Sequence, residues 1–367
     1  MQNNKRAALI IIAILSFILI YAGQFFVGEM LSESAKNTTV NPVTYRHMSM
    51  RTSGLKHEIN ILEIDVSKGC AIVKSVLSYN RTYGFEFLSD MIKRGKAYAG
   101  VNAGFFYEYG QPSGLVIIDG KMASSSSGKY PSFILKDGKA VFETVSLNIK
   151  VGYSGGSFKC RVNQDSSKQG AVLYNSFYGA TNRIKSKNVT VTVENNVVVK
   201  ISKTGHATKI PKNGYLISFF NTAKLPQNAK SIKKGTKLKI DAFDRIGADE
   251  QAYECGCYLV KNGKNVAPSQ DAWIGSLESY DPRTAIGIKK DGKVMLVTCD
   301  GRQPKYSYGM TGKEFAKYLI SLGIKDAAML DGGASTEMIL NGKIVNRTSG
   351  GGDERLMGGA IAVIIKK

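Results

Sequence analysis

The chain has 367 residues, with 50 Lys and Arg against 29 Asp and Glu, and a formal net charge of +21. Its hydrophobic fraction of 43% is enough to bury a core, which excludes a largely disordered chain. The high glycine count indicates many tight turns and disfavours an all-helical bundle. Only three histidines are present, far apart in the sequence, so His-based metal pairs and Ser-His-Asp triads have little support.

The N-terminal region carries an apolar run over residues 7–27, preceded by Lys5 and Arg6. About 20 helical residues suffice to cross a bilayer, so this run predicts a transmembrane signal-anchor after a cytoplasmic tip of residues 1–6. The alternative is a signal peptide cleaved near Gly23 or Ala35. In both cases the two cations keep the short end in the cytoplasm. We therefore expect a single-pass cell-membrane protein whose C-terminal domain is extracytoplasmic.

The region after the apolar run divides into a tether and a domain. Residues 28–56 are polar without periodicity and predict a linker. Near-alternating β-branched residues predict strands over 57–66 and 71–78, followed by a helix over 85–94 and a strand over 96–101. Asp-Gly pairs at 119–120 and 137–138 predict hairpin turns.

The clearest helix signal lies at residues 311–322. Thr311 and Glu314 form a capping box, apolar residues recur at helical spacing, and Gly323 ends the pattern. A short buried strand over 325–330 should follow and end at a glycine-rich loop. Together these elements predict an α+β domain over residues 57–367, built on a mixed β-sheet with few flanking helices.

The segment 183–245 predicts a basic lobe. Between residues 183 and 240 thirteen Lys or Arg face a single acid, Glu194. This surface either binds an anionic wall polymer, phosphorylated glycan or lipid, or is simply a solvated lysine-rich face. No module that combines aromatic and basic residues supports a nucleic-acid partner.

Four polar, glycine-bearing clusters stand out, each placing a charged or amide side chain where backbone can approach a ligand. They are NAGFF from Asn102, DPRTAIG from Asp281, DGR from Asp300, and LDGGAST from Leu330, with DER from Asp353 near the C-terminus. Any one of them alone is an ordinary turn signal.

Together with the middle run IPKNGYLISFF, these motifs resemble the phosphodiester glycosidase domain family. That family includes the lysosomal enzyme that uncovers mannose phosphate and bacterial proteins labelled as exopolysaccharide-related. The resemblance covers residues 57–367 and is strongest from 281 to 365. Ala103, Ala334 and Glu337 depart from the family's usual residues, and Glu337 adds a carboxylate beside the expected site.

The resemblance implies a site for a sugar-1-phosphodiester. Arg283 and Arg302 have the planar fork that pairs with phosphate. Asp331 is the expected base or nucleophile, and Asn102 the residue that aligns sugar or water, with Asp300 and Glu337 as further acids. The remaining expected binding residues are Thr284, Gly104, Gly332, Gly333, Ser335, Thr336, Tyr107 and Arg355. Backbone N–H groups of the loop 332–335 could form an anion nest, and Asp331 could instead cap a turn or ligate Ca²⁺ or Mg²⁺.

The expected activity is therefore hydrolysis of a sugar-1-phosphodiester in a surface polymer, glycolipid or phosphorylated glycan. Two alternatives stay open. One is a non-catalytic factor that binds or assembles wall polymer or exopolysaccharide. The other is a transferase that uses the same cleft.

Overall fold

The computed structural model describes residues 31–67, 69–146, 148–164 and 170–366. The predicted cytoplasmic tip and the transmembrane segment over 7–27 lie outside these residues. Within the described part of the chain, no helix combines the length and apolar character needed to cross a membrane.

The largest sheet has eight strands and is antiparallel throughout the described residues. In spatial order its strands are β1 (Leu31–Val40), β2 (Val43–Thr52), β3 (Leu55–Ile64), β24 (Val294–Cys299), β23 (Arg283–Lys289), β25 (Ile324–Met329), β19 (Tyr258–Lys261) and β20 (Lys264–Asn265).

Two five-stranded antiparallel sheets complete the main body. One has the order β27 (Lys343–Ile344), β26 (Met338–Leu340), β6 (Ala99–Asn102), β29 (Gly359–Ile365) and β4 (Ala71–Leu77). The other, which we call the joint sheet, has the order β10 (Lys139–Glu143), β9 (Ser132–Lys136), β18 (Gln251–Glu254), β7 (Val116–Ile118) and β8 (Lys121–Ser124).

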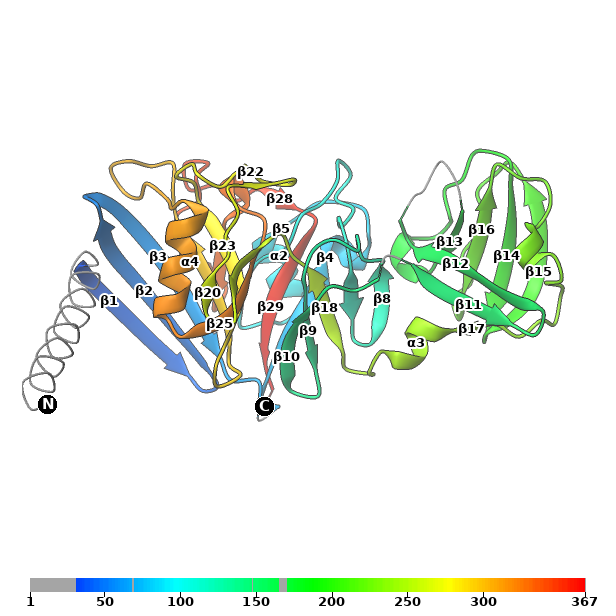
Figure 1. Ribbon diagram of the computed structural model, residues 1–367, viewed down its shortest axis with the longest axis horizontal. Helices are drawn as coiled ribbons and strands as arrows, with labels where there is room; N and C mark the ends of the chain where they lie inside the picture. Colours follow the sequence, from blue (N-terminus) through cyan, green and yellow to red (C-terminus); the bar gives the residue numbers. More distant parts are fainter. Residues whose placement is uncertain (1–30, 68, 147, 165–169, 367) are drawn as a thin grey trace, which may run out of the picture.

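A seven-stranded sheet forms the lobe at the end of the molecule opposite β1 and β2 (Figure 1). Its order is β15 (Val197–Thr204), β14 (Asn188–Glu194), β16 (Gly214–Phe220), β13 (Ala171–Tyr174), β12 (Gly156–Val162), β11 (Ile149–Tyr153) and β17 (Lys239–Ile240). The pair β12 and β13 runs parallel, and the other pairs of this sheet are antiparallel.

Short elements fill in the rest of the described chain. The two-stranded sheets pair β21 (Gln270–Asp271) with β22 (Gly275–Ser276), and β5 (Glu86–Phe87) with β28 (Leu356–Met357). The α-helices are α2 (Leu88–Arg94), α3 (Asp241–Arg245) and α4 (Gly312–Ser321), and the 3₁₀ turns are η1 (Ser78–Asn80), η2 (Ser176–Tyr178), η3 (Gln227–Ala229) and η4 (Gly333–Ser335).

The joint sheet connects the two parts of the molecule because both of its faces are buried. Phe133, Leu135 and Tyr253 pack into the core of the main body, whereas the alternate residues Ile134 and Ala252 pack into the core of the lobe. Side chains of a strand alternate between faces, so the four strands β9, β18, β7 and β8 serve two cores at once. The lobe is thereby fixed to the body by a continuous hydrophobic contact.

Many sequence predictions for local structure are confirmed. The capping box of Thr311 and Glu314 is present in α4, and Gly323 follows with φ +80°. The predicted strands 57–66 and 71–78 correspond to β3 and β4, the Asp-Gly pairs close the β7–β8 and β9–β10 hairpins, and α2 begins three residues later than predicted. The fold is mostly β with few helices, as expected.

Three predictions need correction. Residues 31–52 are not part of a tether, because β1 and β2 form a hairpin that extends the large sheet from β3. The lobe begins at β11, well before residue 183. Its first strands contribute apolar residues to the lobe core, and these residues carry no charge, so the charge pattern did not reveal them. The sequence predicted a mixed sheet, but among the described strand pairs only β12 and β13 are parallel, and the others are antiparallel.

The motif loops gather at one end of the main body. Antiparallel pairing places the start of β23 beside the ends of β24 and β25, because Arg283 pairs with Cys299 and Ala285 with Met329. In the neighbouring sheet, the end of β6 lies beside the starts of β26 and β29. The common end of these two packed sheets is therefore where we examine the site.

Candidate functional site

The Asn102 side chain joins its own motif segment to two others, those of Thr284 and Asp331. Its Oδ1 accepts hydrogen bonds from Thr284 Oγ1 at 2.9 Å and from the Glu337 N–H at 3.3 Å. Its Nδ2 donates to the carbonyl oxygen of Asp331 at 2.6 Å. Asn102 is buried and its amide is fully engaged, so it positions the Asp331 loop. The predicted role of aligning sugar or water is not available to an amide bonded in this way.

Asp331 is the one predicted acid whose residue is only partly buried. It follows β25, and its N–H donates to the Ala103 carbonyl at 3.1 Å while its Oδ1 accepts from Gly332 N at 2.9 Å. Burial raises the pKa of the Asp331 carboxyl, and the Ser335 hydroxyl, the Arg355 cation and the Gly332 N–H act against that rise. The carboxylate is thus held in a fixed position near the Arg355 cation, on a residue that is only partly buried.

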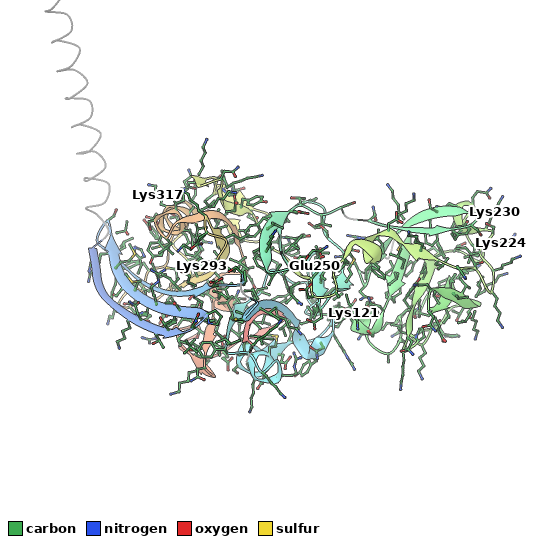
Figure 2. The ribbon with its side chains drawn as sticks, turned by 90° about the horizontal axis from the view of Figure 1, so that it is seen from below. Lys121, Lys224, Lys230, Glu250, Lys293 and Lys317 are labelled. Carbon is green, nitrogen blue, oxygen red and sulfur yellow. The ribbon has the colours of Figure 1, made fainter. Side chains whose placement is uncertain are left out.

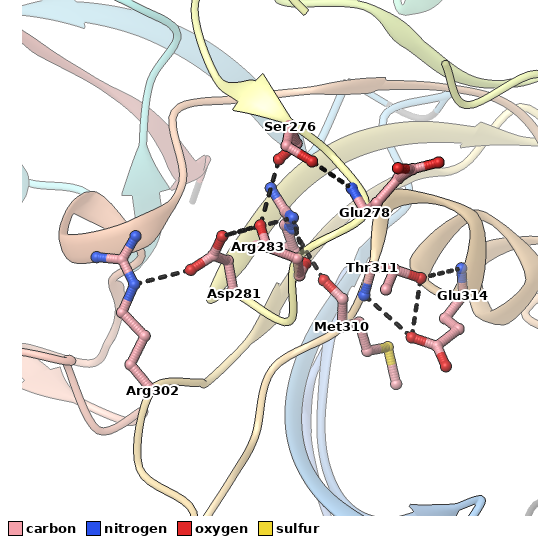
Figure 3. A network of polar contacts seen from close by, with 9 residues as sticks. Ser276, Glu278, Asp281, Arg283, Arg302, Met310, Thr311 and Glu314 are labelled. Carbon is pink, nitrogen blue, oxygen red and sulfur yellow. Dashed lines mark hydrogen bonds and ion pairs between the residues drawn. The ribbon is translucent and has the colours of Figure 1, made fainter. Parts of the chain in front are cut away.

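Arg302 lies beside the Asp331 loop with half of its side chain exposed. Its Nε donates to Asp281 Oδ1 at 2.8 Å, and Figure 3 shows this pair at the edge of the network around Arg283. The terminal nitrogens lie over Gly333, where a Cβ would approach Nη2 at 3.1 Å. The glycine therefore leaves room for a guanidinium whose outer N–H groups point away from its anchoring carboxylate. The anion-binding role of Arg302 stays a prediction.

Arg283 occupies a different environment. Its side chain is 1% exposed, and it donates from Nε to the Met310 carbonyl at 2.9 Å and from Nη2 to the Ser279 carbonyl at 2.8 Å (Figure 3). Burial lowers its pKa, and the nearby Asp281 opposes that shift. These bonds brace the segments before β23 and α4. A guanidinium buried in this way does not reach a phosphate in the site. The predicted phosphate-binding role of Arg283 is therefore not supported, and Arg283 instead stabilises the surrounding segments.

The sequence predicted that backbone N–H groups of the loop 332–335 bind an anion, but three of them are bonded within the protein. Gly332 N donates to Asp331 Oδ1, Gly333 N to the Pro282 carbonyl, and Ser335 N to the Gly332 carbonyl. Thr284, Ser335 and Thr336 are buried as well. These residues fix the shape of the loop instead of offering donors to a ligand.

Glu337 forms a buried carboxyl pair with Glu354. Glu337 is 0% exposed, and burial followed by contact with Glu354 raises its pKa to about 9. It is therefore protonated at neutral pH and donates its proton to Glu354. Burial acts to raise the pKa of Glu354, but this hydrogen bond and those from Ser89 outweigh it and lower that pKa. Glu337 thus holds the loop before β28 against α2. Because it is enclosed, it does not act as a second catalytic carboxylate.

Asp300, at the end of β24, is likewise buried and fully bonded. Asn346 Nδ2 donates to its Oδ1 at 2.9 Å and the Arg347 N–H to its Oδ2 at 2.8 Å. Burial raises the pKa of Asp300 to about 6. The same Asn346 also donates to the Thr336 carbonyl. Asp300 therefore supports the Asp331 loop from behind, and its catalytic role is not favoured.

An aromatic wall adjoins the loop after Asn102. Phe105 stacks on Trp273 with ring centroids 5.7 Å apart, and Tyr107 meets the edge of Trp273 at 5.2 Å. Phe105 is buried, whereas Tyr107 is 49% exposed, and the ligand-facing role of Tyr107 stays a prediction. Gly104 is a close-approach glycine, since a Cβ there would meet the Glu254 carbonyl oxygen. It shapes the site without contacting a ligand.

Three residues near the site were not predicted from the sequence. Glu354 lies within the quoted DER cluster, so its proximity to the site could have been noticed. Asn346 and Tyr253 follow no motif; the buried Tyr253 hydroxyl has no hydrogen-bond partner among the described residues, and the Asp331 charge adds to burial in raising its pKa. Only folding brings these two side chains to the site.

A metal ion has no evident ligand set here. Across residues 31–67, 69–146, 148–164 and 170–366, no three His, Cys, Asp or Glu side chains come together in a way that could hold one. The neighbours of the Asp331 carboxylate are the Arg355 cation, the Ser335 hydroxyl and the Gly332 N–H.

Residues 187–364 match the family model described as phosphodiester glycosidase, which confirms the resemblance inferred from the motifs. A 100-residue stretch is 34% identical to the SPbeta prophage-derived uncharacterized protein YomE of Bacillus subtilis strain 168. That match spans 27% of this chain and only 15% of the relative.

Two solved structures share the fold. A hypothetical protein from Synechocystis matches with a TM-score of 0.75 at 20% identity, over 91% of this chain and 64% of its own. A protein described as exported, from Burkholderia pseudomallei K96243, matches with a TM-score of 0.67 at 22% identity, over 85% and 75%. At these identities the likeness establishes the fold.

The Glu337 pair predicts a pH-dependent stability. The pKa of Glu337 rises from 4.5 to about 9 on folding, so the folded state holds a proton that the unfolded state releases between these values. Its contribution to the free energy of unfolding is complete below pH 4.5 and is lost as pH rises toward 9. Glu337→Gln keeps a donor for Glu354 but does not titrate, so we expect it to gain stability relative to wild type between pH 5 and pH 9.

The measurement is urea unfolding at several pH values, with Glu194→Gln as a control that removes an exposed carboxylate. Parallel stability curves for wild type and Glu337→Gln would show that Glu337 is already ionised in the folded protein.

Proposed function

We propose that this chain is a membrane-anchored, extracytoplasmic phosphodiester glycosidase that hydrolyses a sugar-1-phosphodiester in a surface polymer, glycolipid or phosphorylated glycan. The observation that carries the proposal is the partly buried Asp331, whose carboxylate has Arg355 nearby and whose loop has Arg302 beside it. The match to the phosphodiester glycosidase family supports the type of reaction. The likeness to a protein described as exported accords with the proposed location.

The reaction breaks the bond between C1 of the sugar and the phosphate oxygen, adds water at C1, and releases a phosphate monoester. Such reactions pass through an oxocarbenium-like transition state, and a carboxylate assists them either as the base that activates water or as the nucleophile. Asp331 fills that role because the other two candidates, Asp300 and Glu337, are enclosed by protein. One carboxylate suffices, because a phosphate leaves more readily than a sugar alkoxide.

The cations assist the departing group. Arg302 is anchored through Nε, so its two terminal nitrogens remain directed over Gly333 toward the site. A guanidinium fork binds two phosphate oxygens at once and neutralises charge as it develops. Tyr107, exposed against Trp273, offers a ring face for the sugar.

The lobe supplies a second component, retention of an anionic polymer. All thirteen Lys and Arg side chains between residues 183 and 240 are exposed, with Glu194 as the sole acid in that range. Figure 2 shows Lys224 and Lys230 at the outer end of the lobe, far from the large sheet. A dense cationic surface concentrates polyanions by long-range attraction. The same lobe would support binding alone if the chain were a non-catalytic wall-polymer factor.

Replacement of Asp331 is the first test. Asp331→Asn keeps an oxygen that can accept from Gly332 N but removes the negative charge, so we expect sugar release to fall by about 10²–10⁴-fold with little change in thermal unfolding. Release is measured from a panel of hexose and hexosamine 1-phosphodiesters. Asp353→Asn, which changes an exposed carboxylate near Arg355, serves as the control. Equal turnover by Asp331→Asn and wild type would remove Asp331 from the mechanism.

The pH profile tests the ionisation state of Asp331. A base or nucleophile must be ionised, so activity should rise with pH through the pKa of Asp331, which burial places above the usual 3.8. The Arg355 cation lowers that pKa. Arg355→Gln should therefore move the acid limb of kcat/KM to higher pH, whereas Lys343→Gln, an equal change of charge at another exposed site, should not. An unmoved limb in Arg355→Gln would count against this coupling.

Lysine neutralisation tests the lobe. A protein with four lobe lysines changed to Gln should bind a polyphosphate-bearing wall polymer more weakly, with a smaller dependence of affinity on salt. The positions are Lys224, Lys230, Lys233 and Lys234, and the matched exposed control positions outside the lobe are Lys264, Lys290, Lys305 and Lys313. If both quadruple variants bind alike, the lobe has no special role in retention.

A further inference from the structure

A cavity of about 450 Å³ lies between the lobe and two loops of the main body. It is separate from the Asp331 site and is lined mainly by aromatic and polar side chains. They are Tyr83, Tyr109, Gln111, Tyr174, Tyr178, Asn182, Arg183, Ile184, Lys185, Ser186 and Phe220. A volume of this size accommodates a small ligand of one or two rings.

The Arg183 guanidinium packs against two of the aromatic walls. Its guanidinium carbon lies 4.4 Å from the ring centroid of Tyr83 and 5.2 Å from that of Tyr178. Gly179 makes room for it, since a Cβ there would lie 3.3 Å from Nη2. A guanidinium that packs against aromatic rings can still donate from its N–H groups to an anion.

The charge of the cavity is one-sided. Lys185 adds a second cation next to Arg183, and no acid is among the lining residues. Tyr109, 65% exposed, is the lining residue whose ring is most open to a ligand. An anionic group joined to a ring with apolar C–H faces therefore satisfies the chemistry of this cavity, and a phosphate-bearing sugar has both parts.

The walls are fixed to each other before any ligand arrives. The Thr82 N–H donates to the Phe177 carbonyl at 2.9 Å, and the hydroxyls of Tyr83 and Tyr178 are 3.2 Å apart. The Gly84 N–H donates to the Tyr109 carbonyl at 2.9 Å. Loops from the main body are thus bonded to the lobe, and a preformed pocket loses little ordering entropy on binding.

One loop connects this cavity to the Asp331 site. Ala103 accepts the Asp331 N–H at one end of the loop, and Tyr109 lines the cavity six residues later. Six residues span at most about 22 Å even when fully extended. A single substrate chain could therefore occupy both places.

We infer that the cavity around Arg183, Lys185 and Tyr109 is a subsite for a phosphate-bearing sugar unit of the substrate chain, remote from the bond that is cleaved. Assigning that unit to the glycosidase substrate rests on the proposed function. Recognition of the phosphosugar itself rests on the cavity alone.

The test is binding of glucose 6-phosphate to the full chain by calorimetry in 0.15 M salt, compared with glucose and with inorganic phosphate. We expect glucose 6-phosphate to bind more tightly than either fragment. Arg183→Met should weaken that binding at least tenfold, and Lys185→Gln several-fold. Lys187→Gln removes an exposed lysine two residues outside the lining and should change the affinity less than twofold.

The outcomes separate the two proposals. Equal affinities for Lys185→Gln and Lys187→Gln together with an unaffected Arg183→Met would overturn the subsite, as would glucose or inorganic phosphate binding as well as the phosphosugar. Asp331→Asn should retain the wild-type affinity for glucose 6-phosphate. If the probe binds as expected but no phosphodiester is cleaved by wild type, the subsite stands and the glycosidase proposal fails.

Discussion

The Asn102 carboxamide is the contact on which the geometry of the site depends. Its oxygen accepts from Thr284 and from the Glu337 N–H, and its nitrogen donates to the Asp331 carbonyl, so one side chain links both packed sheets to the loop that presents the carboxylate. Asp could not replace it, because a carboxylate has no donor for the Asp331 carbonyl. Gln has both groups, but its additional methylene would displace them in a buried space. Each bond left unmade in such a place costs about 1–3 kcal/mol.

Around that amide, the enclosed charged residues are hydrogen-bonded or neutral, whereas the residues proposed to act on substrate are partly exposed. Arg283 donates hydrogen bonds to backbone carbonyl groups, and Asp300 accepts them from Asn346 and Arg347. Glu337 is protonated and bonded to Glu354. Burial of an unpaired charge would be costly, so each enclosed group is bonded or neutral. Asp331 and Arg302 remain partly exposed and carry charge toward solvent. The chemistry of a residue here is set by its burial more than by its type.

The local signals in the sequence predict the local structure well. The capping box and helical spacing at 311–322, and the Asp-Gly turns, act through neighbouring residues, so they survive without knowledge of the fold. The β1–β2 hairpin could not be predicted in this way. Its polar side chains at the edge of the sheet have no hydrophobic alternation, and pairing with β3 supplies the order that propensity does not.

The glycine-rich motifs of the sequence form loops that the structure brings together at one end of the main body, and their catalytic role stays a prediction. A Cβ at Gly104 would meet the Glu254 carbonyl oxygen, and Gly333 has φ +58° with the Arg302 guanidinium next to it. Sequence could not distinguish Arg283 from Arg302, since both stand next to such loops. The difference arises when the Ser279 and Met310 segments fold over one guanidinium and leave the other beside Gly333.

The joint sheet gives the lobe a role that its charge alone would not. A lysine-rich domain on a flexible linker would raise the local concentration of a polyanion without orienting it. Here Ile134 and Ala252 bury one face of the joint sheet in the lobe core, while Phe133 and Tyr253 bury the other in the main body. Because Tyr253 also packs against Gly104 beside the Asp331 loop, the two cores share one short strand. Under the proposed function, a polymer bound to the lobe would be held at a fixed orientation to the Asp331 carboxylate, as positioned cleavage of a long chain requires.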